Sequence, residues 1–336
     1  MSHKVHVDLA PLSFLVSMMT SANCNAGTMA REQLGVCAEP NLHGLLLLMN
    51  ALDGHEHHIR RVLGLIPGVI QKLTDQFSEA NLNAVIAIGP GYWDALYPAV
   101  RPLDFQPFSP LLVDDLAMPA VPYDVLLKIR ADRYDVLHLA IQQCYQQLMP
   151  HLELVEQTHC FRFMDGRDLT GFIDQPQSPR GRKKRELALI SETSQPELAQ
   201  GSYVCYQRYR LDLNRWQQLT QQQQEVIIGQ RKLDGQHLPM AQLSEQSHAV
   251  KAAVTDDFGE FYPLVFQNMP FGQLKVQGLV ILACSAEPTA YLAWLNRRLG
   301  DSGAQNYDLL LDYVQADSGA AFFAPSISFL EDQAGL

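Results

Sequence analysis

The chain has 336 residues, of which 47% are hydrophobic and 18% are charged, and its formal net charge is −11. This length and apolar content are sufficient for one large or two medium domains, and they exclude a disordered chain. The acidic balance argues against a nucleic-acid-binding protein, because such a protein needs a basic face to neutralise phosphates.

The distribution of cysteines and apolar segments indicates in which cellular compartment the protein is expected. The six cysteines are scattered and form no C-x-x-C pair, which is typical of free thiols in a reducing compartment. We therefore expect a cytoplasmic protein. No apolar run reaches the roughly 18 residues that a membrane span needs, so no membrane association is expected.

The N-terminal segment, residues 1–32, has two interpretations. The mostly apolar stretch from Leu9 to Met19 suits a signal peptide, but histidines and an aspartate stand where a leader is basic. The other interpretation is a later start at Met29. We treat residues 1–32 as an N-terminal extension.

Strands and amphipathic helices alternate through the first half of the chain. Apolar residues at three- and four-residue steps predict a helix over 55–77, which Pro67-Gly68 is expected to kink or break. Gly89-Pro90-Gly91 predicts a turn after a strand. The predicted strands are 45–49, 83–88, 123–129 and 152–156, and a second helix is predicted over 133–148.

The second half repeats this plan. A polar helix interrupted by glutamines is predicted over 211–229, and another helix over 288–299. The predicted strands are 202–209, 249–255, 263–267 and 278–285. Two successive βαββαβ-like halves predict an α+β fold of two ferredoxin-like units, each an antiparallel sheet with helices on one side, divided at about 150–165.

Two short runs of polar residues stand out. His55-Glu56-His57-His58 lacks the His-Glu-x-x-His spacing that puts two imidazoles on one face of a helix. We interpret it as a polar helix start rather than a metal site. The run from Arg180 to Arg185 is the one strong charge run, and we interpret it as a solvated loop. Docking of an acidic partner is the alternative.

Separated segments of the second half, in a fixed order, resemble the dye-decolourising (Dyp-type) haem peroxidases. The segments are Asp165–Phe172, Gly201–Val204 with Gln207-Arg208, Glu225–Gly229, Ser247-His248, Asn268–Gly272, and Ser318-Gly319 with Phe322–Ser326. The resemblance runs from Gln33 to about Leu330. It implies the dimeric α+β barrel-like superfamily, with residues 33–155 as a ferredoxin-like domain without a haem ligand and residues 156–330 as the haem-binding domain.

The resemblance implies that His248 is the proximal ligand of a haem b iron. On spacing alone, a histidine between a polar loop and a strand is more often a surface or capping residue. Such a ligand usually gives its second N–H to a carboxylate, which makes the imidazole more electron-donating. By resemblance Asp308 is that carboxylate, whereas its pattern alone suggests an aspartate on a helix surface.

On the opposite side of the iron, the resemblance implies that Asp174 is the catalytic acid–base and that Asn268 is a polar helper. A positioned carboxylate takes the proton from one peroxide oxygen and returns it to the other, provided that its pKa suits. The alternative for Asp174 is a turn residue that caps the backbone before Pro176.

The chain departs from the family pattern at three places. Phe266 stands where the family has a distal arginine, whose cation stabilises the negative charge that develops as the O–O bond breaks. An apolar residue there is also expected to raise the pKa of Asp174 by desolvation. Gln175-Pro176 replaces a Gly-Thr pair beside the haem. Arg231 follows Gln230, one place later than the arginine that often faces a haem propionate in the family.

The residues and the resemblance together predict a haem b peroxidase that oxidises an unknown electron donor with hydrogen peroxide, with turnover slowed by the missing arginine. The alternative is a non-catalytic relative that binds haem or a protein partner. A third reading is a haem carrier or porphyrin-processing enzyme. The resemblance also implies self-association into a homo-oligomer, and it makes haem propionates a further candidate partner of the run at 180–185.

Overall fold

The computed structural model describes residues 30–176, 178–253 and 260–336. The predictions of a signal peptide and of a start at Met29 lie outside the described residues, as does the end of the strand predicted over 249–255.

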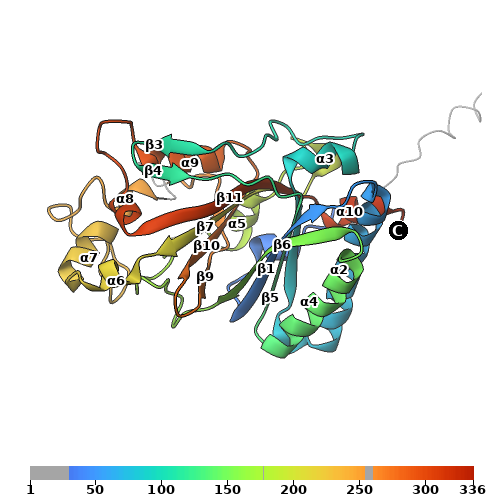
Figure 1. The fold of residues 1–336 in the computed structure, drawn as a ribbon, viewed down its shortest axis with the longest axis horizontal. Coiled ribbons are helices and arrows are strands. Elements are labelled where there is room, and N and C mark those ends of the chain that lie inside the picture. Colours follow the sequence, from blue (N-terminus) through green and yellow to red (C-terminus); the bar gives the residue numbers. More distant parts are fainter. Residues whose placement is uncertain (1–29, 177, 254–259) are drawn as a thin grey trace, which may run out of the picture.

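The helices and strands divide between two halves of the chain (Figure 1). The helices are α1 (Leu34–Cys37), α2 (Glu56–Gln76), α3 (Pro90–Leu96), α4 (Tyr134–Leu148), α5 (Gly181–Ala188), α6 (Leu213–Gln217), α7 (Gln221–Ile228), α8 (His248–Lys251), α9 (Ala290–Leu299) and α10 (Ile327–Ala334), with 3₁₀ turns η1 (Ser78–Ala80), η2 (Pro196–Leu198) and η3 (Leu309–Asp312). The strands are β1 (His43–Ala51), β2 (Asn83–Ile88), β3 (Leu111–Val113), β4 (Leu116–Met118), β5 (Val125–Ala131), β6 (Leu152–Phe161), β7 (Ser202–Leu211), β8 (Val265–Phe266), β9 (Met269–Gly272), β10 (Gln277–Ser285) and β11 (Val314–Ala324).

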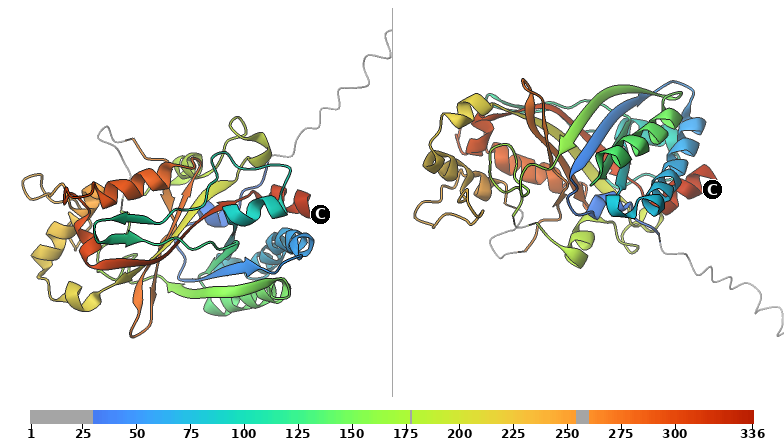
Figure 2. Two further views of the ribbon diagram at one scale, coloured as in Figure 1. Left: turned by 45° about the horizontal axis from the view of Figure 1, so that its top comes forward. Right: turned by 90° about the horizontal axis from the view of Figure 1, so that it is seen from below.

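The nine-stranded main sheet consists of two antiparallel four-stranded halves and the short strand β8, which pairs with β10. The first half has the order β2-β5-β1-β6, and the second has the order β11-β7-β10-β9. Both are the ferredoxin-like arrangement, which confirms the predicted α+β fold of two such units. Single residue pairs join the halves at both edges, Phe323 with Ile88 and Cys160 with Phe271, so the strands close into a barrel. Figure 2 shows the barrel from two further sides.

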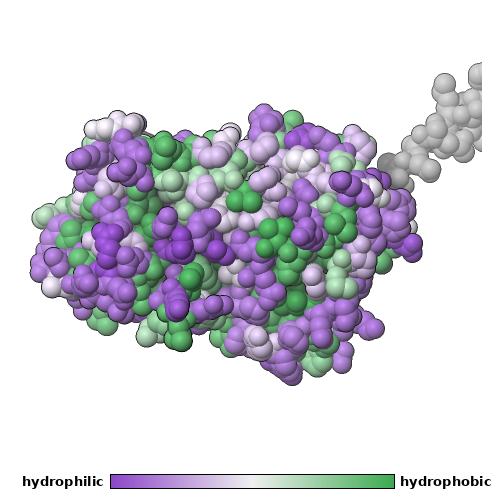
Figure 3. Space-filling view, in the orientation of Figure 1, coloured by the Kyte–Doolittle hydropathy of each residue, from purple (hydrophilic) through white to green (hydrophobic). Residues whose placement is uncertain are grey.

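Alternation along the strands creates three apolar layers. Inward-facing residues of both halves, such as Leu46, Leu126, Val204 and Phe322, fill the barrel. The outer face of the first half is covered by α2 and α4, and the outer face of the second half is covered by α9. On the face seen in Figure 3, apolar residues are scattered among polar ones.

The end of the chain belongs to the core of the first half. Phe323 on β11 and Phe329 and Leu330 on α10 pack in the same cluster as the apolar faces of α2 and β1. The side chain of Gln33 donates to the carbonyls of Ile86 and Pro325, which ties β2 to the segment before α10. Residues from the two ends of the described chain therefore complete one core.

Most predicted elements are confirmed, among them β1, β2, β5, β6, β7, β10 and helices α2, α4 and α9. A break at Pro67 is wrong, because α2 runs through it, whereas a kink there stays a prediction. Gly89-Pro90-Gly91 begins α3 instead of forming a turn, since proline is favoured in the first turn of a helix. The helix predicted over 211–229 is split into α6 and α7.

Two further predictions are wrong. The run Arg180–Arg185 is exposed as predicted except at Lys184, but it is not a loop, because it enters α5. Lys184 is buried and donates to the carbonyl of Ala38 at 3.0 Å. No described residue of 249–253 is in a strand; Ala249 lies in α8, which begins after Ser247. As predicted, His55 starts a helix, and the described cysteines are free.

Lys128 is a buried cation inside the barrel. Its ammonium donates to the backbone carbonyl of Gln267. Burial, together with the charge of Arg130, lowers the pKa of Lys128 from 10.5 to about 7. The unfolded chain therefore binds more protons between about pH 7 and 10, so stability rises with pH across this window.

Replacing this cation by an apolar side chain of similar length is expected to stabilise the fold at neutral pH. We expect Lys128→Met to raise the free energy of unfolding at pH 7 by about 1–3 kcal/mol, since the removed desolvation cost exceeds the lost hydrogen bond. The free energy of unfolding of the variant should also depend less on pH between about 7 and 10 than that of the wild type. Urea unfolding at pH 7 and pH 9.5 measures both, with exposed Lys72 replaced by methionine as the control. A destabilised variant at pH 7 would contradict this account.

Candidate functional site

His248 opens α8, and its imidazole is paired with a carboxylate from a distant part of the chain. Nδ1 of His248 lies 2.7 Å from Oδ2 of Asp308, which caps η3. Asp308 is fully buried. Burial opposes its ionisation, but the charges and hydrogen bonds of His248 and Arg298 outweigh burial and hold the pKa of Asp308 well below its usual range. With Nδ1 donating to this carboxylate, Nε2 of His248 is left as the acceptor that can ligate a metal.

Arg298 completes this arrangement and was not found from the sequence. Its Nε donates to the same Oδ2 of Asp308 at 2.7 Å, and its side chain is buried. Helix α9 places it there, with the ring of Trp294 4.9 Å from the guanidinium. The sequence offered one signal for its burial, a position in the last turn of an amphipathic helix. That signal is weak, because an arginine there usually keeps its guanidinium in water.

Asp174 lies in the segment between β6 and α5, and it is half-buried. Its Oδ1 accepts a hydrogen bond from Nδ2 of Asn268 at 3.3 Å. Burial and the nearby charge of Asp168 raise the pKa of Asp174 to about 7, against the opposing effects of Asn268 and His248. A carboxyl group with this pKa can both accept and release a proton near neutrality.

Asp168 is a second half-buried carboxyl group that lines the same cavities as Asp174, and sequence reasoning missed it. It accepts hydrogen bonds from the backbone N–H and the hydroxyl of Thr170. Burial raises the pKa of Asp168 despite these bonds. Its place in the Asp165–Phe172 segment was the available signal, but nothing in the pattern distinguished it from Asp165, which is exposed and paired with Arg167.

Two adjoining narrow cavities bring these residues together. They enclose about 570 Å³ and 540 Å³, part of it open to solvent, and both are lined by Asp168, Asp174, Gln175 and His248. The first cavity is also lined by Asn268 and by apolar residues of the outer face of β10 and β11, and the second by Phe172, Ile173 and Ile228. A site with a few polar groups between apolar walls is typical of a small-molecule or cofactor pocket.

The side chains that line the pocket suit an iron-containing cofactor. The imidazole of His248 faces the pocket from α8, and a half-buried pair of polar side chains, Asp174 and Asn268, faces it from other segments. Oδ1 of Asn268 is buried and has no hydrogen-bond partner, so it can accept one from a ligand. The donor set fits the haem that the sequence predicts.

The remaining predicted site residues lie farther from the pocket. Phe266, on β8, packs against Trp294 with ring centroids 5.0 Å apart, and it is not among the residues that line the two cavities. The guanidinium of Arg231 is bound to Asp234 and Gln236, whereas Gln230 lines the second cavity.

Gln175 keeps a backbone conformation that favours glycine. Its φ is +47°, in the left-handed region, where a side chain causes strain of roughly 1–3 kcal/mol. This is the position at which the Dyp-type pattern has glycine. The loop after Asp174 therefore has the backbone form that glycine would adopt, although the residue has changed.

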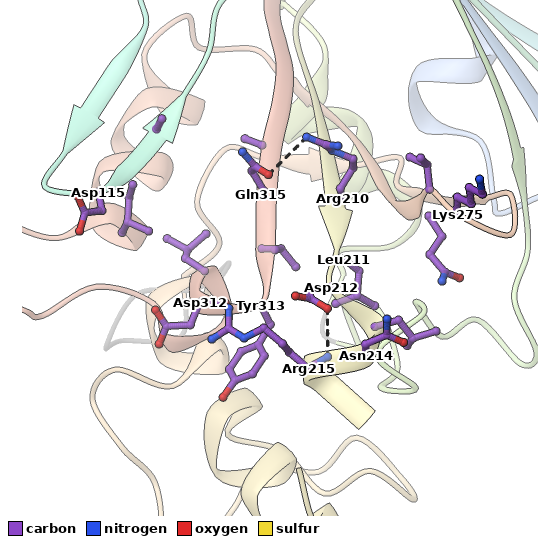
Figure 4. A pocket seen from close by; sticks show the side chains of 18 of the residues that line it. Asp115, Arg210, Leu211, Asp212, Asn214, Arg215, Lys275, Asp312, Tyr313 and Gln315 are labelled. Atoms are coloured by element: carbon purple, nitrogen blue, oxygen red, sulfur yellow. Dashed lines mark hydrogen bonds between the residues drawn. The ribbon is translucent and has the colours of Figure 1, made fainter. Parts of the chain in front are cut away.

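A third cavity adjoins the first of these two cavities and shares part of its lining (Figure 4). Leu211 and Val314 line both it and the first cavity. In Figure 4, Arg215 lies close to Tyr313, and its guanidinium is 5.3 Å from the ring centroid. The cavity presents both acidic and basic side chains, so its charge favours no single class of ligand.

Clusters of metal-ligating side chains and membrane-spanning helices are both absent from the part of the chain that the structure covers. Within residues 30–176, 178–253 and 260–336, no group of three or more histidine, cysteine, aspartate or glutamate side chains is arranged to hold a metal ion. No helix in these ranges is long and apolar enough to cross a membrane.

Comparison with family models matches nearly the whole described chain. Residues 44–162 match the N-terminal domain of Dyp-type peroxidases, and residues 165–329 match the C-terminal domain. A dye-decolorizing peroxidase of Mycobacterium tuberculosis is 33% identical over 282 residues, which is 83% of this chain and 83% of that protein.

Solved structures agree with these matches. A protein of Shewanella oneidensis assigned to the Dyp-type peroxidases is 39% identical, with a TM-score of 0.86 over 90% of this chain and 99% of that one. A variant of DypB from Rhodococcus jostii RHA1, in complex with heme, is 29% identical, with a TM-score of 0.82 over 88% of this chain and 96% of that one.

Proposed function

Because the chain belongs to the Dyp-type peroxidase family, and is an oxidoreductase of the peroxidase class, we propose that its pocket holds haem b and that His248 ligates the iron. The observation that carries the proposal is the 2.7 Å contact between Nδ1 of His248 and Asp308, at the wall of a cavity that also contains Asp174. The heme complex of the DypB variant supports the choice of cofactor.

When bound, haem supplies an iron that takes the oxidising equivalents of hydrogen peroxide and passes them to a donor. Asp308 holds the proton of His248 on Nδ1, which fixes the tautomer and directs Nε2 to the pocket. Neither Phe266 nor Arg231 lines the two cavities. Their contact with the cofactor therefore stays a prediction from the resemblance.

Asp174 is proposed as the acid–base. As a carboxylate it takes the proton from the first oxygen of hydrogen peroxide and returns it to the departing oxygen, which leaves as water. The amide N–H of Asn268 orients this carboxylate, and its free Oδ1 can accept the second proton of the peroxide as a hydrogen bond. These retained groups favour a peroxidase over a non-catalytic relative.

The partners and the compartment are proposed on coarser grounds. The family implies hydrogen peroxide and an electron donor, and we infer that the chain forms a homo-oligomer in the cytoplasm. Free cysteines among the described residues support a reducing compartment. We further propose that residues 33–155 serve as the domain without a haem ligand and that residues 156–330 carry the cofactor.

A titration with hemin tests the role of His248. We expect the purified wild-type protein to give a shifted Soret band at one equivalent. In His248→Ala the spectrum of the histidine-ligated form should be lost, and the affinity should fall by more than the roughly 10–100-fold typical of losing an outer partner of a metal ligand. Replacement of exposed His138 by alanine is the matched control. Failure of the wild type to shift the Soret band would overturn the proposal.

A further inference from the structure

The carboxylate of Asp308 is shared between two donors. Nδ1 of His248 and Nε of Arg298 both lie 2.7 Å from Oδ2, and Oδ1 accepts the backbone N–H of Leu310 at 3.0 Å. One oxygen therefore receives a hydrogen bond from the predicted iron ligand and an ion pair from a guanidinium. The two donors compete for the same negative charge.

Arg298 is held firmly in this position. Its backbone carbonyl accepts the N–H of Asp308 at 2.7 Å, so the two residues contact each other through main chain and side chain. The guanidinium lies 4.9 Å from the ring of Trp294 and 5.4 Å from that of Tyr209, whose hydroxyl is 3.4 Å from Nη1. Asp308 is its ion-pair partner among the described residues.

A buried arginine stays charged, so its effect on the carboxylate is permanent. A free carboxylate would draw the Nδ1 proton of His248 towards itself and make the imidazole a stronger electron donor. A guanidinium on the same oxygen withdraws negative charge from it. The proton then stays closer to the imidazole, and the imidazole donates less to whatever Nε2 binds.

We propose that Arg298 is a positioning residue that limits electron donation by His248 through Asp308 and thereby sets the reduction potential of the bound iron. This inference rests on the proposed function, because it requires haem on His248. It adds a residue from α9 whose effect on the iron passes through Asp308, although its side chain also lines the first cavity.

The midpoint potential of the ferric–ferrous couple, measured by spectroelectrochemistry of the reconstituted protein, tests the inference. We expect Arg298→Gln to shift the potential to a more negative value and Arg298→Lys, which keeps the charge, to stay closer to the wild type. The iron–histidine stretching band of the ferrous protein should move to higher frequency in Arg298→Gln. An unchanged potential and an unchanged band would refute the role of Arg298.

A positive charge near the iron also raises the reduction potential directly, because it favours the ferrous state, which carries one positive charge less. The effect that Arg298 exerts through Asp308 therefore needs a separate test. The same Arg298→Gln change is made in an Asp308→Asn background, where the carboxylate is gone. If Arg298 acts through Asp308, the shift should largely disappear there. A shift of equal size in both backgrounds would show action at a distance and would overturn the proposal.

Two controls separate the possible failures. Wild-type protein that does not take up hemin disproves the proposed function, whereas protein that binds hemin but shows no shift in Arg298→Gln disproves only this inference. Where Arg298→Gln does not fold, Arg298→Met replaces it, because an unbranched apolar side chain suits the contact with Trp294 without placing a polar group against it.

Discussion

Replacing Asp174 by asparagine is expected to slow the reaction of the haem-loaded protein with hydrogen peroxide by about 10²–10⁴-fold, the usual contribution of a positioned acid–base. Asparagine keeps the size of the side chain and its contact with Asn268, but it cannot take up a proton. Stopped-flow absorbance after mixing with peroxide gives the second-order rate constant. The Soret band of the resting protein should be unchanged, which shows that the cofactor site is intact.

The pH dependence of this step carries further information. Only the ionised form of Asp174 can accept the proton of the peroxide, and the pKa of Asp174 is raised to about 7 by burial. The wild-type rate constant should therefore rise with pH through about 7 and then level off, and the variant should lack this rise. Asp165→Asn, in an exposed carboxylate of the same segment, is the matched control. A similar pH profile in wild type and Asp174→Asn would remove Asp174 from the mechanism.

Introducing the missing cation is expected to speed the same step. Phe266→Arg should raise the rate constant by about 10²–10³-fold, the usual effect of one preorganised group that stabilises developing negative charge. Phe266 is half-buried against Trp294, which lines the first cavity, so the methylene chain of an arginine can lie along the indole ring and direct the guanidinium towards the pocket. The measurement is again stopped-flow, with the pH held well above 7 so that Asp174 is ionised.

Phe266→Leu is the control for this gain, because it removes the aromatic ring without adding charge. It should leave the rate constant within a few-fold of the wild type. Equal rates for Phe266→Arg and the wild type, with haem bound to both, would mean that residue 266 does not face the reacting oxygens. The predicted correspondence with the distal arginine would then be wrong.

The fold was predictable wherever apolar periodicity is strong. The buried strand β1 and helices α2 and α4 have clear patterns, and their bounds were found to within a few residues. Strand β11 was missed because Val314–Ala324 is rich in alanine, with glycine and serine, and its strand form comes from pairing with β7. Helix α8 is a single turn that contains a valine, a residue that favours strands. Local propensity alone therefore predicted a strand there.

Prediction of the site depended on the resemblance more than on local pattern. His248 and Asp308 lie 60 residues apart, so only the fold brings their side chains to 2.7 Å. Arg298 was missed because burial of an arginine depends on partners that the sequence does not display. The raised pKa of Asp174 was expected from an apolar Phe266, but burial and the charge of Asp168 cause it.

The shared core at the two ends of the chain bears on the order of assembly during synthesis. Domains generally fold as units as the chain emerges, N-terminal part first. Here the cluster beneath α2 lacks Phe323, Phe329 and Leu330 until almost the whole chain has left the ribosome. The first half therefore cannot reach its final packing while the second half is still being made. Part of the apolar core of the first half therefore stays uncovered until these three residues have been made.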